Sequence, residues 1–182
     1  MWFQMISMVL DVVAGLLAGT CLLRLVMQRQ RISFHQPLGR FVFALTDWLV
    51  LPLRKVIPAR SSWDLSSLVG AWLIKLAQVS LLWMLSGAAA PWALLPWFSV
   101  LSLAQLVVSA LSALVLVYAV MSWVSPGSPV YDMVARLTEP VLRPFRRVVP
   151  LIGGIDLSPL VLLLALQMLG VVLLNLQMPG LR

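Results

Sequence analysis

The sequence holds only one cysteine and one histidine, Cys21 and His35. A disulfide framework, a thiolate zinc site or a Cys/His cluster therefore cannot be built within one chain. Acidic residues are also scarce, since Asp and Glu together number 6 in 182 residues. No glycine-rich phosphate loop and no Ser/His/Asp order appears. These shortages predict a protein that is not an enzyme and has no metal or other cofactor.

Charge of either sign is rare as well. Only 10% of the residues are charged and 62% are hydrophobic, whereas a soluble domain has about a quarter and about half. The net charge of +7 does not point to nucleic acid, because such binders carry their basic residues on a water-facing surface. Here the basic residues stand in short segments between apolar runs. The composition predicts a membrane protein whose acidic partner is lipid.

Four apolar runs are about 20 residues long, the length that crosses a hydrocarbon core of roughly 30 Å. They cover residues 3–26, 65–85, 99–123 and 157–176. Two shorter apolar stretches, 41–51 and 130–142, do not reach this length. In the second, Asp132, Arg136 and Glu139 share one helical stripe and the remaining positions are mostly apolar. This pattern is typical of a short helix in the membrane interface.

The chain contains a repeat. Residues 37–69 align without a gap with residues 129–161, at an offset of 92 positions. Since each repeat carries two spans, both begin on the same side of the membrane and the repeats are parallel. We therefore predict an all-α membrane protein with four transmembrane helices in two parallel tandem repeats, residues 1–92 and 93–182. Each repeat has a short interfacial helix and a Pro/Arg-rich loop.

The repeated loop has features that start a span. Its prolines are expected to end the interfacial helix and keep the following arginines extended; they are Pro52, Pro58, Pro144 and Pro150. Gly153 and Gly154 permit a tight reversal in the second copy. The predicted caps of the following spans are Asp64, Ser66, Asp156 and Ser158.

Two interpretations of the loop remain open. In the first, the basic residues hold the loop on one side of the membrane and the other residues turn the chain. In the second, the basic residues bind anionic lipid headgroups or a protein partner. The candidate residues for binding are Arg54, Lys55, Arg143, Arg146 and Arg147.

The distribution of basic residues predicts the topology. Residues 28–64 contain six Lys and Arg residues and residues 125–156 contain four, whereas the connection 86–98 contains none. Short basic segments stay in the cytoplasm. Both repeated loops should therefore be cytoplasmic and both termini outside.

Asp11, Lys75 and Gln167 are polar residues within the predicted spans. Lys75 and Asp11 fall at similar depths, and an unpaired lysine near the middle of a membrane costs about 3 kcal/mol or more. The sequence predicts that these two pair, and that Gln167, the repeat equivalent of Lys75, hydrogen-bonds across the pseudo-symmetry axis. The alternative is that Lys75 reaches the interface along its own stem.

The segments PLRKVIP…WDLSS and RPFRRVVP…GGIDLSP resemble the tandem signatures of the YggT family of small bacterial integral membrane proteins, which has relatives in plastids. The resemblance covers nearly the whole chain. The first copy departs from the signature, with Ser61 and Ser62 in place of the glycines and Ser67 in place of the proline. Membership implies a bacterial cytoplasmic membrane and a link to osmotic-stress tolerance and to envelope or division organisation. In plastid relatives it implies cytochrome assembly and nucleoid distribution.

Two functions remain after these exclusions. The favoured one is a membrane scaffold or assembly factor that contacts anionic phospholipid, a membrane-protein partner or a second copy of itself. The alternative is a small ion channel or permease component, which requires a polar file through the spans. Span one carries Ser7, Asp11, Gly15 and Gly19 at four-residue steps, but stripes of small residues usually mark close helix packing.

Overall fold

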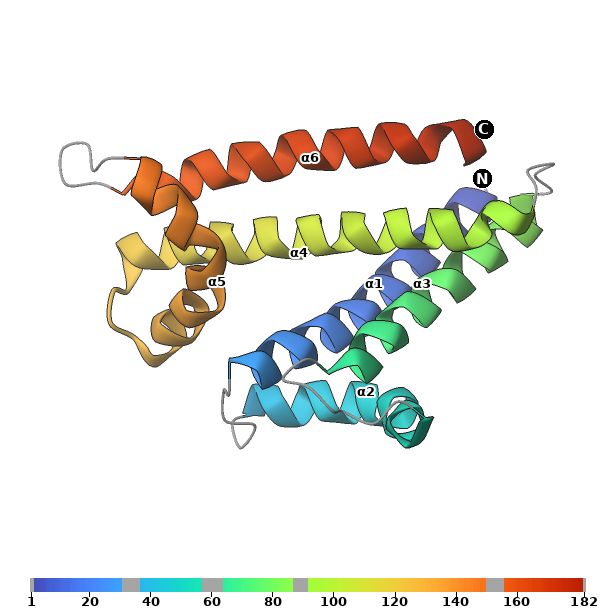
Figure 1. Ribbon diagram of the computed structural model, residues 1–182, viewed down its shortest axis with the longest axis horizontal. Helices are drawn as coiled ribbons and strands as arrows, with labels where there is room; N and C mark the ends of the chain where they lie inside the picture. Colours follow the sequence, from blue (N-terminus) through green and yellow to red (C-terminus); the bar gives the residue numbers. More distant parts are fainter. Residues whose placement is uncertain (1, 31–36, 57–63, 87–91, 150–155, 182) are drawn as a thin grey trace. The chain divides into compact units, whose positions relative to one another are not determined.

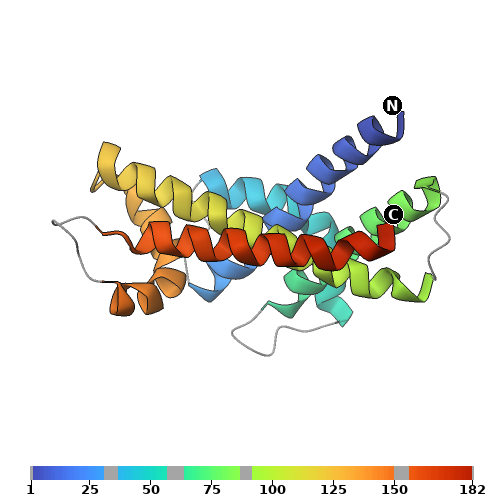
Figure 2. The same ribbon diagram turned by 90° about the horizontal axis from the view of Figure 1, so that it is seen from above.

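The computed structural model describes residues 2–30, 37–56, 64–86, 92–149 and 156–181. Within these ranges the chain is helical and has no strand (Figures 1 and 2). The elements in order are α1 (Trp2–Arg29), α2 (Pro37–Val56), α3 (Leu65–Ser86), the short 3₁₀ helix η1 (Trp92–Leu94), α4 (Leu95–Val124), α5 (Pro129–Val148) and α6 (Ser158–Leu181).

Four of these helices, α1, α3, α4 and α6, are long and apolar enough to cross a membrane. Each coincides with one of the four predicted spans and extends it by a few residues at one or both ends. The shorter helices α2 and α5 follow the first and third spans, one in each repeat. The predicted all-α membrane fold with two tandem repeats is therefore confirmed.

The chain divides into two compact units. Unit 1 comprises Met1–Leu106 with Asn175–Arg182, and unit 2 comprises Val107–Leu174. The division falls inside α4, because the first half of this helix places Leu103 and Leu106 against the unit 1 core. The second half of α4 packs with α5 and α6 in the unit 2 core, through Val115 and Tyr118. The compact units therefore do not coincide with the predicted repeat boundary at residue 92.

Small residues bring the helices of unit 1 close together. Ala18 and Cys21 of α1 pack with Ala71 of α3 and Val50 of α2 in one buried cluster. A side-chain carbon at Gly70 of α3 would lie 3.5 Å from Leu49, a residue of α2. Helices without large side chains at their contact approach closely in a membrane, and α1 and α3 lie side by side in Figure 1.

The prediction that Pro52 and Pro144 end the interfacial helices is wrong. Pro52 lies inside α2, and Pro140 and Pro144 lie inside α5, so the helices continue to Val56 and Val148. All three prolines are exposed. A proline inside a helix displaces the carbonyl group of the residue four positions earlier, and on an exposed face this displacement does not disturb the packing of the core. The two helices are correspondingly not straight (Figure 1).

Arg146 and Arg147 are therefore helical rather than extended, and they lie in the last turn of α5. Cations are favourable there because the C-terminal end of a helix carries partial negative charge. The helix ends at Val149, which is extended, with φ −93° and ψ 113°. Val149 precedes Pro150 in the sequence, and a residue before a proline disfavours the helical conformation. The helix therefore ends before Pro150 and not at Pro144. Pro58, Pro150, Gly153 and Gly154 lie outside the described residues, and the predicted reversal stays a prediction.

Candidate functional site

Each repeat contains an ion pair that joins its amphipathic helix to the span that follows. In unit 1, Arg54 Nη2 of α2 lies 2.6 Å from Asp64 Oδ2, directly before α3. In unit 2, Arg146 Nε of α5 lies 3.0 Å from Asp156 Oδ2, two residues before α6. The two pairs occupy equivalent repeat positions, and we call each pair a clasp. A clasp fixes the end of the amphipathic helix to the start of the next membrane-crossing helix.

Both aspartates also bond the first turn of the helix that follows. Asp64 Oδ2 accepts a hydrogen bond from Ser67 Oγ at 2.7 Å, and the predicted capping role of Ser66 stays a prediction. Asp156 Oδ1 accepts from the backbone N–H of Ser158 at 2.9 Å. Such bonds satisfy backbone or side-chain donors that the first helical turn leaves free.

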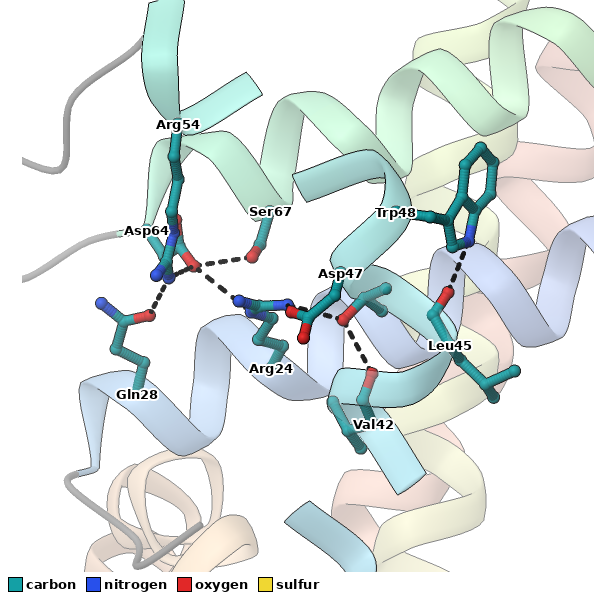
Figure 3. Close-up of polar contacts among 10 residues, drawn as sticks. Arg24, Gln28, Val42, Leu45, Asp47, Trp48, Arg54, Asp64 and Ser67 are labelled. Carbon is teal, nitrogen blue, oxygen red and sulfur yellow. Dashed lines mark hydrogen bonds and ion pairs between the residues drawn. The ribbon is translucent and has the colours of Figure 1, made fainter. Parts of the chain in front are cut away.

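The clasp of unit 1 lies in a buried polar network (Figure 3). Arg24 of α1 has a side chain that is only 2% exposed, and its Nη1 lies 2.7 Å from Asp47 Oδ1 of α2. The same nitrogen donates to Thr46 Oγ1 at 2.8 Å, and Arg24 Nε is 3.9 Å from Asp64 Oδ2. Arg24 of α1 thus connects α2 with the residue that directly precedes α3.

Three further contacts belong to this network. The Arg24 guanidinium lies 4.4 Å from the centre of the Phe43 ring, a cation–π contact that strengthens when water is excluded. Arg54 Nη2 also donates to Gln28 Oε1 of α1 at 2.9 Å. The repeated Thr46 uses its hydroxyl to donate to the Val42 carbonyl group at 2.7 Å, and Thr138 does the same toward Val134 at 2.9 Å in unit 2.

The clasp of unit 2 is more exposed and has different neighbours. Arg146 Nη1 lies 2.8 Å from Glu139 Oε2, and the two side chains are 34% and 46% exposed. Arg146 Nη2 donates to Tyr118 Oη at 2.5 Å. The Tyr118 ring stacks on that of Tyr131, with ring centres 5.7 Å apart. One arginine therefore links α4, α5 and the start of α6.

The clasps hold both aspartates in the ionised form at neutral pH. Burial raises the pKa of Asp64, but hydrogen bonds from Arg54 and Ser67 and the Arg54 charge outweigh it. Burial likewise raises the pKa of Asp156, and hydrogen bonds from Ser158 and Arg146 with the Arg146 charge outweigh it there. Both pKa values therefore lie below the ordinary 3.8, and each clasp is an ion pair.

The structure divides the five predicted headgroup-binding cations into two groups. Arg54 and Arg146 are held in the clasps, where Nη2 of Arg54 and the Nε, Nη1 and Nη2 atoms of Arg146 donate to protein acceptors. Lys55, Arg143 and Arg147 are exposed. The three cations of the second group lie outside the clasps, and lipid binding by them stays a prediction.

Asp11 and Lys75 are brought together through a residue that sequence reasoning missed. Lys75 Nζ donates to Gln78 Oε1 at 2.8 Å, and Gln78 Nε2 donates to Asp11 Oδ1. Lys75 and Gln78 are buried, whereas Asp11 is exposed. Gln78 therefore stands between the two charges that were predicted to pair directly. Gln167 is exposed on α6 in the other unit, and its predicted bond across the axis stays a prediction.

The sequence contains features from which the roles of Arg24 and Gln78 could have been predicted. Arg24 is the only charged residue between Asp11 and Arg29, and a charge inside an apolar run requires a partner. Gln78 follows Lys75 by three residues, a spacing that brings two side chains together on one helix. Among the described residues no three His, Cys, Asp or Glu side chains gather in a way that would hold a metal ion.

The clasps and the four spans define an integral membrane protein built from a doubled unit of span, amphipathic helix and span. The same doubling appears in the comparison with known families. The family model described as CCB3/YggT matches residues 3–85 and 97–177, once in each repeat. The chain belongs to this family.

Two bacterial relatives match this chain over most of their length. The chain is 36% identical over 172 residues to "Uncharacterized protein PA0392" of Pseudomonas aeruginosa, a match that covers 92% of this chain and 87% of that protein. It is 34% identical over 169 residues to "Uncharacterized protein YggT" of Escherichia coli K12, covering 91% of this chain and 87% of that protein. No solved structure matches the chain.

Proposed function

We propose that the protein is a non-enzymatic scaffold or assembly factor of the bacterial cytoplasmic membrane, and that it works through the exposed faces of its clasped amphipathic helices. The observation that carries this proposal is the two-sided character of α2. One side packs into unit 1 through Val42, Thr46 and Val50, which are all buried. The other side presents large apolar side chains and a cation to the surroundings.

The exposed side of α2 follows a single helical stripe. Phe41, Trp48, Leu51 and Lys55 are separated by three, four or seven residues, so they lie on one face of the helix. Trp48 is 63% exposed and its Nε1 donates to the Leu45 carbonyl group within the helix. Apolar and aromatic side chains beside a lysine are typical of a helix that lies in the membrane interface.

The second amphipathic helix, α5, presents exposed cations of its own. Arg143 and Arg147 of α5 are exposed and four residues apart, and Arg147 is the repeat equivalent of Lys55. Each exposed cation near an anionic membrane contributes about 1 kcal/mol of attraction. The clasps stabilise this presentation because they fix each amphipathic helix to a span. By family resemblance, we infer that the scaffold serves osmotic-stress tolerance and envelope or division organisation.

Affinity capture from native membranes tests the proposal. The full-length protein is extracted in mild detergent, and its bound proteins and lipids are identified by mass spectrometry. We expect a stable membrane-protein complex or homo-oligomer together with anionic phospholipid. Changing Lys55, Arg143 and Arg147 to Gln should weaken the binding of anionic lipid by up to about a hundredfold, because about 3 kcal/mol of attraction is removed.

The matched control keeps the charge, with Lys55→Arg, Arg143→Lys and Arg147→Lys, and should retain the lipid. If the correctly inserted Gln variant binds as much anionic lipid as the wild type, these basic residues have only a topological role. The second candidate, an ion channel, is favoured by one observation, the Asp11–Gln78–Lys75 chain in the spans of unit 1. Selective ion flux by the purified protein in liposomes, without a captured partner, would support the channel instead.

The proposed orientation has its own test. A reporter that is active only outside the cytoplasm should be active when it is fused after Arg182 or inserted near Ala90. It should be inactive near Arg60 or Ile152, because the basic segments around these positions stay inside. Enzyme activity of the reporter in whole cells gives the measurement. An inactive C-terminal fusion, with the protein present in the membrane, would reverse the assignment.

A further inference from the structure

The N-terminal half of α1 presents a carboxylate at the depth of the membrane core. Trp2 and Arg24 of this membrane-crossing helix are about 33 Å apart at a rise of 1.5 Å per residue, close to the thickness of a hydrocarbon core. Asp11 lies between them, about 14 Å from Trp2 and about 20 Å from Arg24. Its side chain is exposed. An acidic group therefore faces outward from unit 1 where lipid tails surround the helix.

The surface around this carboxylate does not suit lipid. Gln4 and Met8 precede Asp11 by seven and three residues, so the three side chains share one face of α1, and all three are exposed. We call these three residues the α1 patch. Met8 suits hydrocarbon, but a charged side chain at the centre of a span costs about 2.5–3.5 kcal/mol. The α1 patch is therefore more favourably covered by protein than by lipid.

Contacts within the chain use only part of the Asp11 carboxylate. Oδ1 accepts a hydrogen bond from Gln78 Nε2, and Gln78 Oε1 accepts one from the Lys75 ammonium at 2.8 Å. In the described part of the chain, no hydrogen bond or ion pair reaches Asp11 Oδ2. A carboxylate oxygen accepts its strongest hydrogen bonds from cationic donors. Asp11 therefore offers an open acceptor to a basic group that approaches the α1 patch.

A second copy of this chain does not supply that basic group. Two copies that are inserted in the same orientation carry Asp11 at the same depth, so a two-fold contact through the α1 patch brings like charges together. Lys75, the cation near this depth, is buried and bonded to Gln78 within its own copy. A helix of another protein has no such restriction, because a basic residue at its centre itself requires an anion.

We propose that the α1 patch binds a membrane-spanning helix of another protein that carries a lysine or arginine near its centre. The basic side chain donates directly to Asp11 Oδ2, while Lys75 reaches the same carboxylate through Gln78. This contact deepens the proposed scaffold function and rests on it, but it uses a membrane-crossing helix instead of the amphipathic ones.

A peptide series on the unchanged full-length protein tests the contact. Three leucine-rich membrane-spanning peptides differ only in their central residue, which is Lys, Leu or Glu and has the same depth in either orientation. Binding to the protein in phosphatidylcholine vesicles is measured by fluorescence energy transfer. We expect the Lys peptide to bind about tenfold more tightly than the Leu peptide, because it adds a charge-assisted hydrogen bond. The Glu peptide should bind no better than the Leu peptide.

The lipid of the vesicles separates this test from that of the scaffold. Phosphatidylcholine has no net charge, so the result does not depend on whether Lys55, Arg143 and Arg147 bind anionic lipid. Failure of the peptide series leaves the capture of lipid and protein by the native scaffold unaffected, and failure of that capture leaves the peptide result unaffected.

Asp11→Asn is the matched change in the protein. It keeps an oxygen for Gln78 and removes the charge, so the folded D11N protein should bind the Lys peptide as weakly as the Leu peptide. Thermal unfolding in detergent shows that the variant is folded. Equal binding of the Lys and Leu peptides to the wild type, or undiminished binding of the Lys peptide to folded D11N, would overturn the proposal. Energy transfer between two labelled wild-type copies that is lost in D11N would also overturn it, in favour of a second copy.

Discussion

Asp64→Asn lowers the free energy of unfolding by about 3–5 kcal/mol, the range measured when one partner of a buried ion pair is removed. The carboxylate of Asp64 is fully buried and lies 2.6 Å from Arg54 and 3.9 Å from Arg24. Asparagine has the same shape but no charge, so Arg24 retains only Asp47 and Arg54 loses its anion. Denaturant unfolding of the purified protein in detergent measures the loss.

Unit 2 supplies the matched control for this change. Asp156→Asn removes the equivalent carboxylate, but the clasp of unit 2 is about one-third exposed on both sides. Water screens such pairs, which typically contribute about 1 kcal/mol or less. We therefore expect Asp156→Asn to have a small effect beside Asp64→Asn. Equal losses from the two substitutions would show that burial by Arg24 does not set the strength of the unit 1 clasp.

Lys75→Met and Asp11→Leu each destabilise the protein by about 3 kcal/mol, while the double replacement recovers most of the loss, because one charge alone in a membrane is worse than none. The structure adds Gln78 to this expectation. Since Gln78 donates to Asp11 and accepts from Lys75, Gln78→Leu should by itself cost about as much as either single change. Thermal stability in detergent provides the measurement.

The repeat offers a control for these substitutions too. Gln167 is the equivalent of Lys75 and is exposed, so Gln167→Leu should leave stability unchanged within about 0.5 kcal/mol. Additive losses in the double replacement of Asp11 and Lys75 would contradict the coupling. They would also remove the support that the Asp11–Gln78–Lys75 chain gives to a transport function.

The spans could be predicted because membrane thickness imposes a minimum length on apolar runs. The clasps could be predicted only in part. The repeated Arg54 and Arg146 were visible in the sequence, but their pairing with aspartates ten residues later depends on how the intervening chain turns. The helix ends were predicted wrongly at Pro52 and Pro144, since a proline that faces outward on an amphipathic helix bends it instead of ending it.

Contacts between distant segments carried the weakest sequence signal. The position of Gln78 between two charges depends on the rotation of α1 against α3, which the apolar pattern of either helix leaves undetermined.

The division of the chain inside α4 also bears on the order of assembly during synthesis. The three helices that surround Arg24 leave the ribosome first, but Leu103 and Leu106, which cover part of their buried cluster, belong to the next membrane-crossing helix. Nascent unit 1 therefore inserts with one side of its core unpacked and becomes complete only after the second repeat has begun to enter the membrane. We therefore expect a chain cut at residue 92 to leave the core of unit 1 without the cover that Leu103 and Leu106 provide.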